Sequence, residues 1–175
     1  GLEPPQVEQP QYHMFHRDRV EYEHFPMVRP PYQMGLTTWS PLACGLLTGK
    51  YNDGRIPEGS RAQQSGYDWM ESDIRSWERD GKLQKVKELE EYAKVHLDCS
   101  VANLALAWAA KNDKVSCILL GATNEQQMES NLKAIRVVET LVAEPHHMEH
   151  IDTILDNKPG NYWGIGNRKG DFPTI

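Results

Sequence analysis

The most constraining feature of this sequence is a short apolar run that stops at a proline and continues into small residues and a lysine. Residues 36–40, Leu-Thr-Thr-Trp-Ser, have the composition of a buried strand, and Pro41 has no backbone N–H to donate to a sheet. The strand is therefore expected to end there. Beyond it, Gly45 and Gly49 allow a left-handed backbone and a close approach to a ligand, and Lys50 adds a positive charge.

This order of strand, backbone-rich loop and cation is typical of α/β proteins that hold an anionic ligand beyond the carboxyl end of a strand. An ordinary tight turn between a strand and a helix, with a lysine on the surface, is the alternative. The residues alone leave both interpretations open.

A second unit of the same kind occupies the later part of the chain. Residues 115–120, Val-Ser-Cys-Ile-Leu-Leu, predict a fully buried strand of the kind found in parallel sheets. Gly121 then supplies a turn, and Thr123 with Gln126 three residues later predicts a capping box at the start of a helix. The free N–H groups of such a helix could bind an anion, although an ordinary helix start would have the same sequence.

The other periodic segments predict one further strand and four helices. The strand is expected at 6–9, and the helices at 18–24, 83–95, 101–111 and 145–155. Ser100 is the expected N-cap of the third of these helices, and Trp108 is expected to pack in the core. Residues 52–80 predict a long loop, which either covers a site or forms an ordered surface excursion.

Composition excludes several classes of function. The chain has 175 residues, enough for one domain, and its formal net charge of −6 argues against a nucleic-acid partner. It has no run of about 18 apolar residues, so no membrane insertion is expected. The three cysteines lack the spacing of a zinc site, and His146 and His150 have no third ligand in the pattern, so we predict no metal site. Cys44 is expected to pack rather than to sense redox state.

Together these segments predict a parallel α/β layout, because a strand precedes two strand–loop–helix units. Both candidate anion sites lie at carboxyl ends of strands. In a (β/α)₈ barrel, phosphate is frequently bound by the loops after the last two strands and by a helix N-terminus. The two units fit that arrangement and indicate a phosphate-bearing cofactor.

Several motifs give the chain a resemblance to a known family. They are Glu8-Gln9, Tyr12-His13-Met14-Phe15, Trp39-Ser40-Pro41-Leu42-Ala43-Cys44-Gly45, Gly49-Lys50-Tyr51, Ser60-Arg61-Ala62, Leu120-Gly121-Ala122-Thr123-Asn124 and Asn157-Lys158-Pro159. With them the chain resembles the aldo-keto reductases from residue 2 to about 159. Within that superfamily it looks most like the beta subunits of voltage-gated potassium channels.

The resemblance implies NADP(H) as the cofactor and a role for each matching residue. Gln9 would lie against the nicotinamide ring, and Lys50 and Arg61 would meet phosphate. The pyrophosphate and ribose would be lined by Trp39, Ser40, Pro41, Leu42, Ala43, Cys44 and Gly45, and the adenosine 2′-phosphate end would be held by Gly121, Thr123, Gln127 and Asn131. The chain departs from the channel subunits at Ser130, where they usually carry Glu, and at Gly59, where a Tyr is expected.

The resemblance also implies a fold and a biological role. Residues 1–159 would form the C-terminal part of a (β/α)₈ TIM barrel, about strands 6–8 with their helices, and residues 160–175 a flexible tail. The catalytic Asp, Tyr, Lys and Asn of the family belong to the first half of the barrel, which would precede Gly1, so no catalytic residue is expected in this chain.

The resulting hypothesis is a C-terminal fragment of a cytosolic regulatory subunit. It would lie at the cytoplasmic face of the plasma membrane, bound to potassium-channel alpha subunits. The full-length protein would form a homotetramer and reduce aldehydes or ketones slowly. The alternatives are an ordinary NADP-dependent aldo-keto reductase without a channel role, and a non-catalytic fragment.

Overall fold

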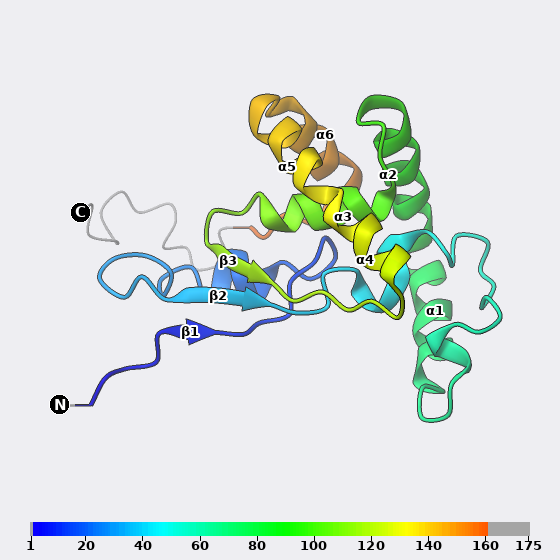
Figure 1. Ribbon diagram of the computed structural model, residues 1–175, viewed down its shortest axis with the longest axis horizontal. Coiled ribbons are helices and arrows are strands. Elements are labelled where there is room, and N and C mark those ends of the chain that lie inside the picture. Colours follow the sequence, from blue (N-terminus) through cyan, green and yellow to red (C-terminus); the bar gives the residue numbers. More distant parts are fainter. Residues whose placement is uncertain (1, 161–175) are drawn as a thin grey trace.

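A computed structural model describes residues 2–160, and its centre is a parallel sheet of three strands (Figure 1). Their order is β1 (Val7–Glu8), β2 (Gly35–Thr38) and β3 (Val115–Ile118), with β2 in the middle. The predicted parallel α/β layout is confirmed. The predicted flexible tail, apart from residue 160, lies outside the described residues.

Helices make up much of the rest of the described chain. The short ones are η1 (Arg19–Glu23, a π-helix), η2 (Ala43–Thr48) and η3 (Arg61–Gln63). The longer ones are α1 (Trp69–Arg79), α2 (Lys82–His96), α3 (Val101–Ala110), α4 (Glu125–Leu132), α5 (Ala134–Ala143) and α6 (His146–Leu155). In Figure 1, α3 lies between the sheet and the group formed by α2, α5 and α6.

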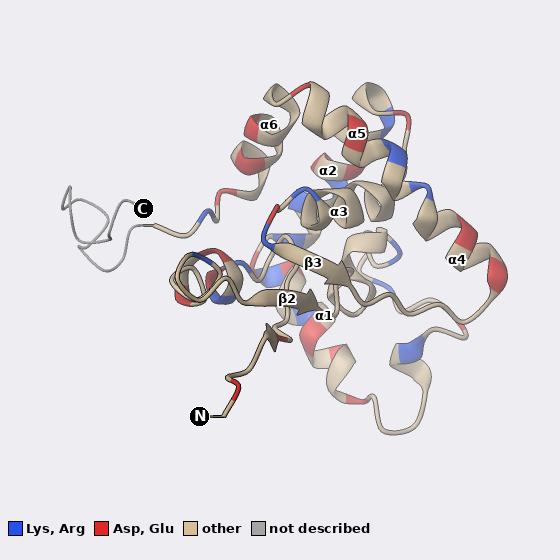
Figure 2. Cartoon of the chain, turned by 60° about the vertical axis from the view of Figure 1, so that its left-hand side comes forward, with Lys and Arg blue, Asp and Glu red and all other residues tan. Residues whose placement is uncertain are grey.

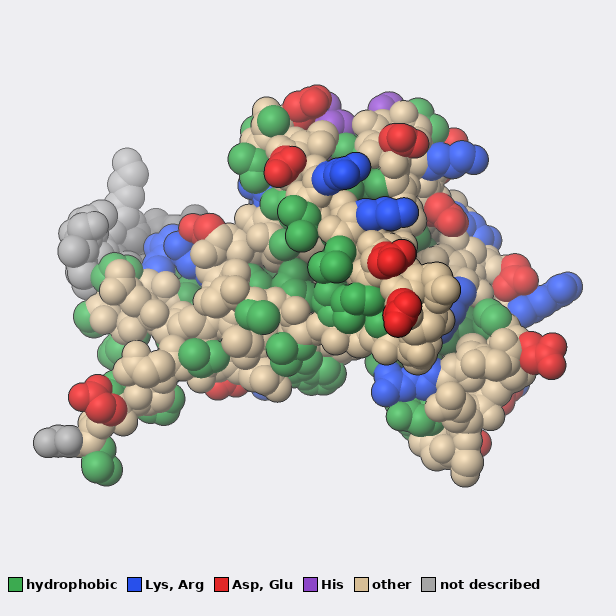
Figure 3. Space-filling model, in the orientation of Figure 1, with side chains coloured by type: hydrophobic (Ala, Val, Ile, Leu, Met, Phe, Trp, Pro, Cys, Tyr) green, Lys and Arg blue, Asp and Glu red, His purple; other side chains and the backbone are tan. Residues whose placement is uncertain are grey.

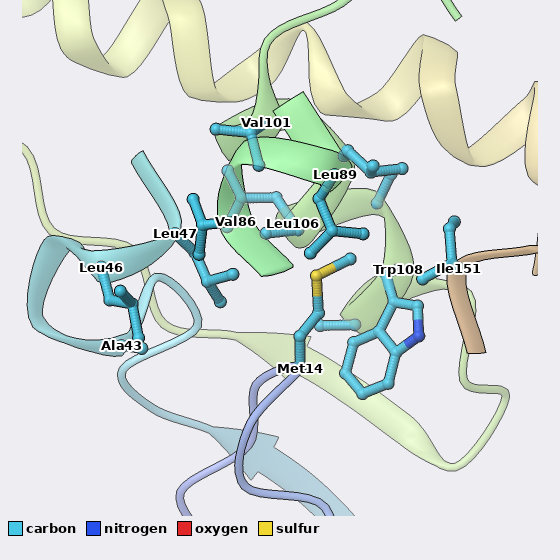
Figure 4. Packing of buried hydrophobic residues seen from close by; sticks show 14 of the residues in the cluster. Met14, Ala43, Leu46, Leu47, Val86, Leu89, Val101, Leu106, Trp108 and Ile151 are labelled. Carbon is cyan, nitrogen blue, oxygen red and sulfur yellow. The ribbon is translucent and has the colours of Figure 1, made fainter. Parts of the chain in front are cut away.

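The core forms around α3, because nearly all of that helix is apolar and buried. Leu106 and Trp108 of α3 pack with Val86 and Leu89 of α2 and with Ile151 of α6 (Figure 4). The expectation that Trp108 packs in the core is confirmed, and Ser100 caps α3 as predicted by accepting a hydrogen bond from the Asn103 N–H at 3.1 Å. Charged residues lie along the helices, whereas β2 and β3 carry none (Figure 2).

Two of the helices were not predicted from the sequence. The segment 52–80, expected as a loop, contains α1, which buries Met70 and Ile74 and packs on α2. Met70, Ile74 and Trp77 recur at helical spacing, so the signal was present, but the Gly-, Asp- and Ser-rich residues before it favoured a loop. The second is α5, which starts directly after α4 and buries Val137 and Leu141. Of the two alternatives for 52–80, this packing favours an ordered surface excursion.

Two strand predictions need correction. The strand predicted to reach Ser40 ends at Thr38, because Ser40 has a positive φ of 55° that a strand cannot continue. The later strand is not fully buried, since Ser116 and Cys117 are exposed. No described element covers the outer side of β3, and exposed hydrophobic side chains lie near β3, α4 and α5 (Figure 3).

A buried arginine joins the segment around η1 to α6. Both outer nitrogens and Nε of Arg17 donate hydrogen bonds, to the Glu21 carboxylate at 2.9 Å and to Asp152 Oδ1 at 2.8 Å. The guanidinium also lies 5.1 Å from the ring centroid of Trp108. Only 5% of the Arg17 side chain is exposed. This residue therefore links η1, α3 and α6 at one point.

Removal of this cation should strongly destabilise the chain. Arg17→Met leaves the carboxylates of Glu21 and Asp152 without their shared partner, and breaking a buried pair in this way costs about 3–5 kcal/mol. The free energy of unfolding in urea measures the effect. Arg19→Met is the matched control, because Arg19 and Glu23 form an exposed pair worth at most about 1 kcal/mol. Equal losses for the two variants would contradict the central role of Arg17.

Folding stability should fall in acid because of His13. Burial, followed by the nearby His16 and Lys82, lowers the pKa of His13 from 6.5 to about 3, and its Nδ1 accepts a hydrogen bond from the Phe15 N–H at 3.2 Å. Between these two pKa values the unfolded chain binds a proton that the folded chain excludes. Stability should therefore drop by about 1.4 kcal/mol for each pH unit below 6.5 and stay level above it.

This dependence is measurable by urea unfolding at a series of pH values. His13→Gln keeps a hydrogen-bond acceptor and removes the titration, so its slope below pH 6.5 should be shallower than that of the unmodified chain. His96→Gln changes an exposed histidine and should keep the original slope. Parallel pH profiles for the His13 variant and the unmodified chain would refute the assignment.

Candidate functional site

The segments that follow the three strands meet at one edge of the sheet, because parallel strands share the direction of their carboxyl ends. Backbone hydrogen bonds continue beyond the strands. The Trp39 N–H donates to the Pro10 carbonyl at 3.1 Å, and the Leu119 N–H donates to the Thr38 carbonyl at 2.8 Å. Gln9, the loop after β2 and the loop after β3 are therefore brought to the same edge.

The loop after β2 has an unusual backbone. Ser40, Ala43 and Cys44 have positive φ values of 55°, 49° and 54°, and Gly45 follows at 95°. Each such non-glycine residue costs of order 1–3 kcal/mol and is kept only where the surroundings hold it in place. Here the surroundings are apolar, since Pro41, Ala43, Leu46 and Leu47 are all buried. Strain held in this way is typical of functional sites.

Hydrogen bonds within this loop fix its shape. The Ala43 N–H donates to the Ser40 carbonyl and the Gly45 N–H to the Leu42 carbonyl, both at 2.9 Å. Cys44 is half-buried and packs on the core, with its Sγ 3.9 Å from Ser40 Oγ, in agreement with the expected packing role. All three cysteines are free thiols.

Two cations lie beside this loop without a carboxylate partner among the described residues. The end of the Lys50 side chain folds over Gly45, so that a Cβ at Gly45 would lie 2.6 Å from Lys50 Cε. Arg61 stacks 4.7 Å from the Tyr67 ring centroid and donates to its hydroxyl at 3.3 Å. Burial, followed by the charge of Arg61, lowers the pKa of Lys50. An anion between the two side chains would relieve this repulsion.

The start of α4 supplies the other half of the predicted site. Asn124 is the N-cap, since its Oδ1 accepts a hydrogen bond from the Gln127 N–H at 2.9 Å. The predicted capping box of Thr123 and Gln126 is therefore wrong by one residue. Thr123 bonds instead to the side chain of Gln127, whose Oε1 accepts from the Thr123 N–H at 2.9 Å and from its hydroxyl at 3.1 Å.

The start of α4 is exposed to solvent, and α4 is held by a hydrogen bond from α3. Gly121, Thr123 and Gln127 are exposed, and Asn131 is half-buried. The buried Asn103 of α3 donates from Nδ2 to the carbonyl of Ser130 at 2.6 Å. Ser130 stands where the channel subunits usually carry Glu, and here its backbone carbonyl accepts the hydrogen bond from Asn103.

The structure groups the predicted residues by strand. Trp39 to Gly45 and Lys50 belong to the loop after β2, with Arg61 close to Lys50, whereas Gly121, Thr123, Gln127 and Asn131 follow β3. Gln9 is exposed directly after β1. Sequence reasoning missed Asn124 and Tyr67. Asparagine is among the best N-caps, and that signal could have identified Asn124; for Tyr67 no local pattern gave a signal.

The three-stranded parallel sheet and the helices around it define a mixed α/β protein. Comparison with protein families gives a more specific result: the model of the aldo/keto reductase family matches residues 3–155. The chain belongs to the aldo/keto reductase family. None of the helices among residues 2–160 combines the length and hydrophobicity needed to cross a membrane.

The position of Lys50 should depend on the missing side chain at Gly45. In Gly45→Ala the new Cβ would collide with the end of Lys50, which is flexible and moves away from the loop. The matched control is Gly59→Ala, because Gly59 also has a positive φ, of 71°, but nothing lies within 4 Å of its added Cβ. Both variants should lose about 1–2 kcal/mol of stability from left-handed strain.

The two variants should differ in the reactivity of the lysine. A lowered pKa leaves more neutral amine, so Lys50 of the unmodified chain should be acetylated faster than the exposed Lys94, as measured by mass spectrometry. Gly45→Ala should slow this reaction several-fold and Gly59→Ala should not. An unchanged rate in Gly45→Ala would show that Gly45 does not determine where the ammonium lies.

Proposed function

We propose that this chain supplies the cofactor-binding part of an NADP(H)-dependent aldo/keto reductase, corresponding to about strands 6–8 of a (β/α)₈ barrel. The observation that carries the proposal is the pair of cations, Lys50 and Arg61, which have no ion-pair partner among the described residues and flank a strained loop at a strand end. A fixed anionic ligand is the partner that this charge arrangement favours.

The residues at the sheet edge suit the chemistry of a dinucleotide phosphate. In the proposal, residues 39–45 bind the pyrophosphate and ribose along the loop, and Lys50 and Arg61 neutralise phosphate charge. The start of α4 binds the 2′-phosphate, because an eight-residue helix with a solvated first turn presents free N–H groups and a positive dipole end. Gln9 faces the nicotinamide ring. When bound, the cofactor supplies the hydride for reduction of an aldehyde or ketone.

The proposal assigns no catalytic acid to this chain. Reduction of a carbonyl needs a group that protonates the developing alkoxide. Tyr12 is buried and donates to Glu21 Oε1 at 2.8 Å, and burial raises the pKa of both Tyr12 and Tyr51. Neither phenol suits proton donation at the strand ends, so carbonyl reduction is proposed for the whole protein and not for this chain alone.

A regulatory role is the finer part of the proposal. The segments that resemble potassium-channel beta subunits, residues 12–15 and 157–159, lie together here, since Asn157 Nδ2 donates to the Met14 carbonyl at 2.7 Å. We propose that the whole protein forms a homotetramer that binds channel alpha subunits at the cytoplasmic face of the plasma membrane. Co-purification of the whole protein with alpha subunits tests this, and a reductase without a channel role is the alternative outcome.

Cofactor binding itself is testable with the 175-residue chain. NADPH titrated into the chain should bind saturably, as measured by its fluorescence, and should raise the melting temperature. Lys50→Gln and Arg61→Gln should each weaken binding about tenfold or more, because a charge-assisted hydrogen bond contributes about 1.5–3 kcal/mol. Lys114→Gln is the matched control, since Lys114 lies at the amino end of β3 and should leave the affinity unchanged.

A comparison of cofactors separates the two halves of the site. Lys50→Gln should weaken NADPH and NADH equally, whereas Thr123→Ala should weaken only NADPH, because NADH lacks the 2′-phosphate. A chain that melts cooperatively but binds neither cofactor would refute the proposal. Equal NADPH affinity of the unmodified chain and the Lys50 variant would show that Lys50 does not bind the cofactor.

A further inference from the structure

A group of histidines and a glutamate gathers at the junction of α5 and α6, away from the candidate cofactor site. Glu144 is the C-cap of α5, and His146 and His147 begin α6. Glu144 Oε2 lies 3.9 Å from His146 Nε2 and 3.5 Å from His147 Nε2, and the three atoms all lie within 4.8 Å of one another. Two imidazole rings and one carboxylate therefore offer ligand atoms close enough together to share one ion.

A second layer of side chains orients this group. His147 is buried, and its Nδ1 lies 2.7 Å from the hydroxyl oxygen of Tyr92 on α2. Metal binding requires the tautomer in which Nδ1–H donates to that oxygen, which leaves the Nε2 lone pair of His147 available on the side of Glu144. Such a hydrogen bond on the far nitrogen is typical of histidines that bind metals, because it fixes the tautomer and the ring orientation.

Tyr92 is itself held between aromatic rings. The His150 ring stacks on it with centroids 4.3 Å apart and an interplanar angle of 13°, and the His96 ring lies 4.6 Å away. Burial and the nearby His146 lower the pKa of His147, which keeps its ring neutral near pH 7. His147 is therefore held in place by Tyr92 of α2. Glu144 and His146 are 55% and 64% exposed, so their side chains can change rotamer.

We infer that Glu144, His146 and His147 form a binding site for a divalent transition metal, with Zn²⁺ as the best-suited ion. Zinc takes imidazole nitrogen and carboxylate oxygen together in tetrahedral sites, whereas calcium and magnesium prefer oxygen ligands alone. Zinc–ligand distances of about 2.0–2.2 Å place ligand atoms about 3.4 Å apart. Small rotations of the two exposed side chains bring the group to that spacing, and water completes the coordination.

The proposed site lies on the helical side of the molecule. In Figure 1, α3 separates the α5–α6 junction from the sheet, and Figure 3 shows histidine side chains at the top of the same view. A bound ion would join the end of α5 to the start of α6 and, through His147 and Tyr92, to α2. Its expected effect is stabilisation of this helical layer, whether or not the chain binds a dinucleotide.

The experiment uses the full 175-residue chain with zinc chloride. Competition with a chromogenic chelator measures affinity and stoichiometry, and thermal melting measures the linked gain in stability. One high-affinity zinc ion per chain and a raised melting temperature are expected. Glu144→Gln and His146→Ala, both at exposed positions, should each weaken binding at least tenfold. His16→Ala is the matched control, because His16 is an exposed histidine of the segment before η1 and lies outside the three ligands and the rings around Tyr92.

Two further measurements keep the inference open to refutation. Tyr92→Phe removes only the hydroxyl and should weaken zinc binding about 10–100-fold, the range found for partners of metal-bound histidines. Cobalt substituted for zinc should show tetrahedral d–d absorption without a thiolate charge-transfer band. Equal losses in the His146 and His16 variants, a thiolate band from the exposed Cys117, or the absence of saturable binding would each overturn the proposed site.

Discussion

The buried guanidinium of Arg17 is the interaction on which the rest of the structure depends. It has two carboxylate partners from opposite ends of the chain, Glu21 and Asp152, and the indole of Trp108 beside it. Because a buried charge is tolerated only when its hydrogen bonds are satisfied, all of these groups must be in place together. Their joint placement fixes α6 against α3, and α3 carries the core that supports β2 and β3.

The candidate cofactor site uses this rigidity. The loop after β2 holds three non-glycine residues at positive φ, and it rests on the buried Leu46 and Leu47. A strained backbone of this kind persists only over a firm support. Packing of the apolar core therefore offsets the backbone strain of the loop. Lys50 and Arg61 remain available to an anion. Membership of the aldo/keto reductase family agrees with this division between support and site.

Much of this arrangement was predictable from sequence where the signal is local. The positions of β2 and β3 and the cap at Ser100 follow from apolar runs and capping chemistry, whereas the anion-binding role of the residues around Gly45 stays a prediction. The exposure of Cys117 was not predictable, because an apolar strand does not reveal whether a layer covers it. The group of Glu144 and His147 was also missed, since the closeness of its ligands depends on the bend between α5 and α6.

The hydrogen bond from Asn157 to the Met14 carbonyl has a consequence for biosynthesis. It spans 143 positions, and the ion pair of Arg17 with Asp152 spans 135. Contacts between such distant segments form only after a long loop closes. During synthesis, Met14 and Arg17 must wait for α6 and Asn157 before they can acquire these partners. Until α6 is made, this aromatic-rich segment lacks its native partners and remains available to chaperones.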